Sequence, residues 1–462
     1  MGKDMSVADI YAIGAIEKFA FNGLRAMLIL FLVSALKQGD QRAFETYSFI
    51  LASAFVIPLL GSLATRMKVP ELAVIQIGLA VGSAGFFLML LGDSWVFEGL
   101  CLIVVGTGFA RALISSTLGR LIRERNPENE QSAFSALYTW FNVGSFLGAI
   151  MLAGVGEKVA WGAAFLLGGL SLAAGAWLAG RSLPSTPLSR RGKVLALMLV
   201  SLVPVRLGFL LPIAWLDYIM GALCVAVPVA MLVLQWRSSR NLTSALTLFV
   251  LALGIFVFFG LYEHSATTIN IFTDRFVDRE VLGFRIPTTF FQALDPTFNI
   301  GLGVLMALLL SSRWGKGAIA KPTIRLNSGF AAMALAFLVF GLAYSTGTRS
   351  PMVLVIFYCG LVLSEVLFVP SALALVSSES APDQRALQMA LLYVMIGSSM
   401  WWSGKISSYF APGDLQKLGS ADFLALFSGL QLLSVAGCLG FAALFACAQW
   451  APGLVRTKAG GR

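Results

Sequence analysis

Long uninterrupted stretches of apolar residues recur along the whole chain, separated by short polar segments. The stretches at residues 72–92, 159–180, 326–346 and 423–449 contain no charged residue. Each reaches the roughly 20 residues that a helix needs to cross the hydrocarbon core of a bilayer. Runs of this length indicate helices, because the strands of membrane barrels are short and alternate apolar with polar residues.

The same pattern over the rest of the chain predicts fourteen spanning helices, and hence an all-α polytopic membrane protein. The predicted spans are residues 8–36, 45–65, 70–92, 95–118, 132–155, 158–180, 193–212, 214–235, 242–270, 286–312, 327–345, 351–378, 386–410 and 421–449.

Composition and charge agree with a membrane location. Hydrophobic residues make up 58% of the chain and charged residues 12%, whereas soluble domains carry about 25% charged residues. The net charge of +10 does not indicate nucleic-acid binding, because Lys and Arg lie in short loops between spans. They are concentrated on the side of the N-terminus, for example at residues 120–125, 181–193 and 313–325. The positive-inside rule therefore predicts a cell (inner) membrane protein with both termini in the cytoplasm.

The order of spans and linkers predicts three parts. Residues 1–181 form an N-terminal six-helix bundle, residues 182–240 a basic linker with an inserted transmembrane hairpin, and residues 241–462 a C-terminal six-helix bundle. Two six-helix halves are typical of the major facilitator superfamily, whose substrate site lies near the bilayer midplane between the halves. Arg206 and Asp217, on either side of the turn of the hairpin, are expected to be interfacial.

Charged residues inside the spans point to transport. Arg25, Arg111, Glu263 and Glu365 each lie within a predicted span. A charge at the membrane centre opposes insertion by about 2.5–3.5 kcal/mol, so it is found paired or facing a wet cavity. A zwitterionic solute needs both signs of charge facing it, and an Arg can bind a carboxylate through two parallel hydrogen bonds.

Motifs around these charges resemble those of the proton-dependent oligopeptide transporter (POT or PTR) family of the major facilitator superfamily. In chain order, the similar segments are residues 16–25 (family motif E-x-x-E-R-F-x-Y-Y-G-x-R), 106–111 (G-x-G-x-x-K), 132–146 (its fifth span), 262–275 (F-E-Q…N-L-F-A-D-R), 286–296 (I-P-x-x-W-F-Q-S-L-N-P) and 364–371 (E-x-x-x-x-P-x-G-L). The resemblance covers most of the chain, in order and in both halves. In its fourteen spans and in the short loop at residues 344–350, the chain resembles the bacterial members of the family.

The resemblance implies a proton-coupled secondary active symporter that imports di- and tripeptides or related amino-acid compounds by alternating access. In the family, the residue matching Arg25 faces the one matching Glu263, and the residue matching Arg111 faces the one matching Glu365. The proton gradient drives such transport, so no cofactor and no ATP are expected. The expected partners are a small-molecule substrate (a peptide), protons and the lipid bilayer.

Site residues follow from the motifs and from the chemistry of the side chains. Substrate binding is expected of Arg25, Asn22, Arg111, Glu365 and Ser371, and proton coupling of Glu17, Lys18, Glu263, His264 and Glu365. His264, the single histidine, qualifies because a free histidine titrates near pH ~6.5. The two Arg–Glu pairs have an alternative interpretation as structural ion pairs that hold helices together, although buried pairs are poor stabilisers.

Two other polar residues in spans have open roles. Asp295 precedes Pro296, where it either caps a kinked helix or acts as a proton site. Lys405 either lines the transport pathway or extends from its span toward the membrane interface.

Departures from the family motifs keep a second function open. Gly14 replaces a glutamate, Lys18 an arginine, Phe21 and Asn22 two tyrosines, and Arg111 a lysine; unlike lysine, arginine does not deprotonate in proteins. The alternative is a major facilitator transporter for a different, non-peptide solute, with export as one option.

Enzymes are a poor fit to the sequence. It contains no clustered metal ligands, no Ser/His/Asp set and no phosphate-binding loop. The five cysteines lie in apolar runs without the spacing of a metal site, so no metal is expected.

Overall fold

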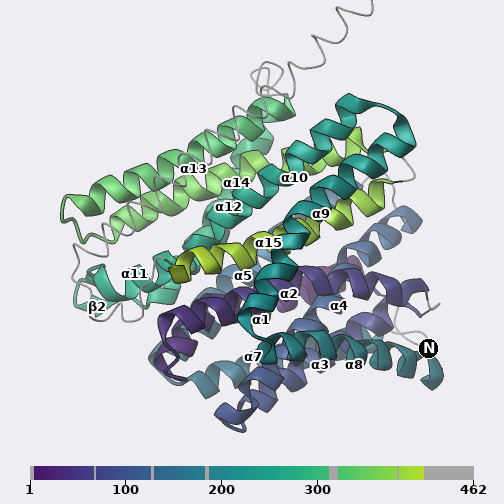
Figure 1. Ribbon diagram of the computed structural model, residues 1–462. Coiled ribbons are helices and arrows are strands. Elements are labelled where there is room, and N and C mark those ends of the chain that lie inside the picture. The colour runs from purple at the N-terminus through teal and green to yellow at the C-terminus, as the bar shows by residue number, and fades with distance from the viewer. Residues whose placement is uncertain are drawn as a thin grey trace, which may run out of the picture. The chain divides into compact units, whose positions relative to one another are not determined.

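The computed structural model describes residues 5–66, 69–125, 130–182, 187–311, 321–381 and 384–409. They are almost entirely helical (Figure 1). The elements are α1 (Val7–Ser34), α2 (Asp40–Arg66), α3 (Glu71–Met89), η1 (Asp93–Trp95), α4 (Val96–Arg125), α5 (Glu130–Leu147), η3 (Gly148–Ala153), α6 (Gly154–Lys158), α7 (Trp161–Arg181), α8 (Leu188–Leu210), α9 (Ile213–Ser239), α10 (Leu242–Tyr262), η4 (Glu263–Ser265), α11 (Thr268–Phe276), β1 (Glu280–Val281), β2 (Phe284–Arg285), η5 (Thr288–Ala293), α12 (Leu294–Ser311), α13 (Pro322–Ser345), α14 (Met352–Glu379) and α15 (Arg385–Tyr409).

The predicted spans correspond to long helices wherever the structure describes them. Of the described helices, 10 are long and apolar enough to cross a membrane. Helices α1, α12 and α15 coincide with further predicted spans, and the last predicted span, residues 421–449, lies outside the described residues. The chain is thus a multi-pass, all-helical membrane protein.

Several predicted spans are not continuous α-helices. In the span at residues 132–155, α5 ends at Leu147 and the π-helical segment η3 precedes α6. The span at residues 242–270 is interrupted, because α10 ends at Tyr262 and the 3-10 turn η4 precedes α11. The Thr267 hydroxyl donates to the Glu263 carbonyl oxygen at 3.1 Å, which satisfies a backbone acceptor at the break. The span at residues 286–312 begins with the 3-10 segment η5 after Pro287 and becomes α-helical only at Leu294.

Contacts divide the chain into two compact units. Unit 1 comprises Met1–Pro212 and Arg279–Thr297, and unit 2 comprises Ile213–Asp278 and Phe298–Arg462. The two helices of the predicted hairpin fall in different units, α8 in unit 1 and α9 in unit 2. The three-part division expected from the sequence stays a prediction.

In unit 1, glycines bring helix backbones into direct contact. A Cβ at Gly144 of α5 would collide with the carbonyl oxygen of Ala15 on α1, and one at Gly148 with that of Phe19. Across α3 and α4, Gly78 and Gly106 oppose each other in the same manner. Small residues at such crossings allow close packing of helices in membranes. The α1–α5 contact matters most here, because α1 carries the charged residues of the candidate site.

Glu157 of α6 holds the segment Arg279–Thr297 within unit 1. Its carboxylate accepts backbone N–H groups of Thr288 at 2.8 Å and Thr289 at 3.0 Å, at the first turn of η5. It also pairs with Arg279 at 3.3 Å, whose side chain is only 4% exposed. One carboxylate therefore satisfies three donors of a segment that is far from it in sequence.

In unit 2, α13 and α14 run antiparallel and side by side (Figure 1). Aromatic rings pack at the centre of this unit: Phe258 of α10 stacks on Phe368 of α14 with ring centroids 4.0 Å apart, and Phe330 of α13 meets both rings edge-on. This packing fixes α10 against α14, the helix that carries Glu365.

Candidate functional site

Helix α1 places a row of polar side chains in the middle of a hydrophobic span. Lys18, Asn22 and Arg25 are spaced by four and three residues, so they lie on one face of the helix. Glu17 precedes Lys18 and points about 100° away from it. The helix begins at a capping box in which Ser6 and Asp9 each accept the other's backbone N–H.

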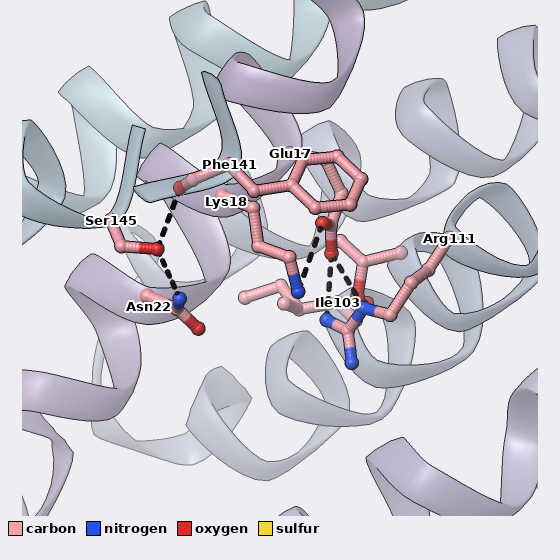
Figure 2. Close-up of polar contacts among 8 residues, drawn as sticks. Glu17, Lys18, Asn22, Ile103, Arg111, Phe141 and Ser145 are labelled. Atoms are coloured by element: carbon pink, nitrogen blue, oxygen red, sulfur yellow. Dashed lines mark hydrogen bonds and ion pairs between the residues drawn. The ribbon is translucent and has the colours of Figure 1, made fainter. Parts of the chain in front are cut away.

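A buried ion pair joins α1 to α4. The Arg111 Nε and Nη2 atoms donate to Glu17 Oε1 at 3.0 and 2.6 Å, respectively. Glu17 is completely buried and the Arg111 side chain is 18% exposed. The Arg111 guanidinium also lies over the ring of Phe21, 4.1 Å from its centroid. Figure 2 shows that the guanidinium approaches Glu17 from the side of α4.

Lys18 adds a second cation beside the same carboxylate. Its Nζ lies 3.9 Å from Glu17 Oε2, an oxygen with no hydrogen-bond partner among the described residues. The ammonium also lies 5.3 Å from the ring centroid of Phe141 on α5. Arg25 acts electrostatically on Lys18 as well. Two cations, Arg111 and Lys18, therefore lie beside one carboxylate.

In the next turns of α1, Asn22 and Arg25 form hydrogen bonds with neutral side chains of neighbouring helices. Asn22 Nδ2 donates to Ser145 Oγ on α5 at 2.6 Å, as Figure 2 shows, and this hydroxyl donates to the carbonyl oxygen of Phe141. The Nε of Arg25 donates to the hydroxyl of Tyr47 on α2 at 3.4 Å. Two of the substituted motif positions, Lys18 and Asn22, thus have partners on α5.

In unit 2, Glu365 of α14 accepts two hydrogen bonds from neutral donors. The hydroxyl of Tyr262 and the Nδ2 of Asn299 each lie 2.7 Å from Glu365 Oε2. Tyr262 is the last residue of α10 and Asn299 belongs to α12. Glu365 therefore connects three helices of this unit.

Glu263 and His264 occupy the break between α10 and α11, and both are completely buried. The Nδ1 atom of His264 lies 3.1 Å from the hydroxyl of Ser407 on α15 and 3.3 Å from that of Thr268. Its Nε2 atom is buried and has no hydrogen-bond partner among the described residues. The role of His264 in proton coupling stays a prediction.

Other residues expected in the site have partners elsewhere in the spans. Ser371 accepts a hydrogen bond from Arg325 Nε of α13 at 2.8 Å. Lys405 of α15 pairs with Asp217 of α9 at 3.2 Å, and the indole of Trp401 also donates to Asp217 at 3.0 Å. Asp295 lies in the first turn of α12.

The structure brings some expected residues together and leaves other pairings untested. Glu17, Lys18 and Arg111 form one cluster in unit 1, in which Glu17 is the partner of Arg111. The pairs Arg25–Glu263 and Arg111–Glu365 each join residues of different units, and they stay predictions.

The neutral partners of these residues were not identified from the sequence. They are Tyr47, Phe141, Ser145, Asn299, Thr268 and Ser407. A polar residue inside an apolar span was an available signal for Asn299, which lies near Asp295 in the predicted span 286–312. Tyr262 could have been chosen because it adjoins Glu263. Within the described ranges, no group of three or more His, Cys, Asp or Glu side chains is arranged to hold a metal ion.

Comparison with known proteins gives one consistent result. The model of the POT family (PTR2) matches residues 72–419. Dipeptide and tripeptide permease B of Salmonella typhimurium is 25% identical over 416 residues, covering 86% of this chain and 84% of that protein. The peptide transporter YePEPT of Yersinia enterocolitica is 26% identical over 455 residues, covering 87% of each.

Solved structures show the same fold. A crystal structure of a peptide transporter POT in complex with alafosfalin superimposes with a TM-score of 0.80 at 18% identity, covering 96% of this chain and 94% of that chain. A POT family transporter in complex with 5-aminolevulinic acid gives 0.79 at 18% identity, covering 96% of both chains. The major facilitator architecture expected from the sequence is confirmed. Because the family model covers most of the chain, including α4 with Arg111 and α14 with Glu365, this protein belongs to the POT family.

Proposed function

We propose that this protein is a proton-coupled symporter that imports small peptides or related amino-acid compounds by alternating access. The observation that carries the proposal is the distribution of charge inside the spans. Unit 1 holds Lys18 and Arg111 beside the Glu17 carboxylate, with Arg25 further along α1, and unit 2 holds Glu263 and Glu365. A zwitterion needs partners of both signs, and the spans supply both.

The carboxylate of the substrate is assigned to unit 1. Arg111 already binds a carboxylate, that of Glu17, through two N–H groups, and a substrate carboxylate has the same chemistry. Arg25 and Lys18 supply further donors from the same face of α1. Charge-assisted hydrogen bonds of this kind are about twice as strong as neutral ones.

Competition for Arg111 provides a way to couple substrate to protons. A substrate carboxylate that takes the Arg111 guanidinium separates it from Glu17. The Glu17 side chain is completely buried, and a buried carboxylate without its cation is favoured in the protonated form. Substrate binding and proton uptake are therefore linked at one ion pair, and reciprocally so.

The carboxylates of unit 2 are assigned to the substrate amine and to proton transfer. Glu365 accepts hydrogen bonds from Tyr262 and Asn299, which hold its carboxylate in place, and a carboxylate is the side chain that binds a cationic group. Glu263 lies at the break between α10 and α11, next to the buried His264. A helix break near the centre of a span is where transporters commonly bind ions and substrate.

A different small solute is the second candidate, and the geometry around Phe21 favours it. In the POT motif this position is a tyrosine, whereas here a ring without a hydroxyl lies against the Arg111 guanidinium. This surface offers Arg111 a cation–π contact in place of a polar lining. A ligand with an anionic group and an apolar body would suit it.

The proposed location is the inner membrane with both termini in the cytoplasm, based on the distribution of Lys and Arg between loops. Single-cysteine variants test it in a background without the native cysteines. Thr348→Cys should react with a membrane-impermeant maleimide in intact cells, and Ser189→Cys only after lysis. The opposite pattern would reverse the orientation.

Arg111→Gln should remove the preference for a free substrate carboxylate. The wild-type protein should bind dialanine roughly tenfold more tightly than dialanine amide, because a hydrogen bond to a charged group contributes about 1.5–3 kcal/mol. In Arg111→Gln the two affinities should become similar, and Arg111→Lys should keep part of the difference. Equilibrium binding by isothermal titration calorimetry measures both.

Arg120→Gln is the matched control, because Arg120 lies on the same helix and is 46% exposed, paired with Glu71. Its preference for dialanine should equal that of the wild type. An unchanged preference in Arg111→Gln would contradict the assignment of the substrate carboxylate to unit 1.

Glu263→Gln should abolish proton-driven accumulation but retain substrate exchange. The substituted amide keeps the size of the side chain but carries no titratable proton. Uptake into liposomes under an imposed pH gradient, compared with counterflow without one, separates the two activities. Glu280→Gln, at the exposed strand β1, is the control and should transport normally. Normal accumulation by Glu263→Gln would refute a coupling role for Glu263.

A further inference from the structure

A groove on the surface of unit 1 lies apart from the candidate transport site. It runs between α3, α7 and α8 and has a volume of about 490 Å³. Its lining residues are Gln76, Ile77, Ala80, Val81, Ala84, Ala176, Trp177, Arg191 and Leu195. Along α3 it extends from Gln76 to Ala84, which corresponds to about 12 Å along a helix.

Most of the groove is apolar and faces outward. Trp177 is 66% exposed and Leu195 42%, and Ala80 and Ala84 are also exposed. Helix α8 is poorly covered by the rest of the protein, since only 28% of its most apolar 18-residue stretch is buried. In a membrane protein such a face is in contact with lipid chains. The small side chains of Ala80 and Ala84 on α3 leave room for the groove between α3, α7 and α8.

A cation lies at one end of this apolar surface. Arg191 belongs to the first turn of α8, beside the point where α7 ends at Arg181. Its Nε atom is buried and has no hydrogen-bond partner among the described residues. Among the described residues that line the groove there is no carboxylate, and Gln76 is the one neutral polar side chain. Arg181, by contrast, already pairs with Asp9 at 2.6 Å and lies over Trp177.

We propose that this groove binds an anionic phospholipid, with the phosphate on Arg191 and an acyl chain along α3. The occupant must combine one anionic group with an apolar chain, because the groove has a single cation at one end and apolar walls beyond it. The loop between α7 and α8 is rich in basic residues, including Arg190 and Lys193, which attract anionic lipids to this membrane surface. Trp177 is of the type that anchors at the headgroup level.

Native mass spectrometry of the purified protein tests the site with phosphatidylglycerol and, separately, phosphatidylcholine. The wild type should retain phosphatidylglycerol with roughly tenfold higher affinity, which corresponds to about 1.4 kcal/mol. Arg191→Gln should lose this preference, whereas Arg190→Gln, its exposed neighbour, should keep it. Ala80→Phe, which fills the groove, should reduce the binding of both lipids.

Several results would overturn the proposal. Equal losses in Arg190→Gln and Arg191→Gln would indicate diffuse surface charge and no defined site. Displacement of the lipid by glycerol phosphate alone would indicate a site for a free phosphate group. A stable dimer that disappears in Ala80→Phe would show that a second copy covers the groove. Retained binding of dialanine by each variant shows that it is folded.

Discussion

The buried Glu17–Arg111 ion pair is the interaction on which the candidate site depends. Neither charge is stable inside a membrane span without the other, and removing one partner of a buried pair typically costs about 3–5 kcal/mol. The pair fixes the register of α1 against α4. It also makes that register sensitive to any ligand that competes for Arg111 or protonates Glu17. The same ion pair therefore holds α1 against α4 and responds to the binding of a ligand or a proton.

Close backbone packing makes this arrangement possible. Gly144 and Gly148 let α5 approach α1 closely enough for Asn22 to reach Ser145 and for Lys18 to lie against Phe141. In the same unit, Glu157 holds Arg279–Thr297 by satisfying backbone donors at the start of η5. This segment is connected by sequence to α11 and α12, most of which belong to unit 2. The second half of the sequence therefore contributes residues to both units.

The sequence predicted the membrane class, nearly all described spans and the family, because bilayer thickness imposes long apolar runs and the charges that interrupt them are few. It identified Glu17, Lys18 and Arg111 as individual residues. It did not identify their mutual contact, because α1 and α4 are far apart in sequence and no local spacing encodes it. The break at Glu263 was missed because residues 242–262 contain no charged residue and no proline that would mark it. The sequence marks Asn299 only as a polar residue in an apolar span and does not single out Tyr47; only packing shows that they bind Glu365 and Arg25, respectively. The chain is a member of a transporter family and not an enzyme.

Peptide-dependent proton movement tests the central claim most directly. The purified protein would be reconstituted into liposomes that contain a pH-sensitive dye, and dipeptides, tripeptides and free amino acids would be added outside. Symport predicts acidification of the interior that depends on a peptide and is absent from protein-free liposomes. If correctly inserted protein that binds a peptide moves it without acidification, the proton-coupled account is wrong.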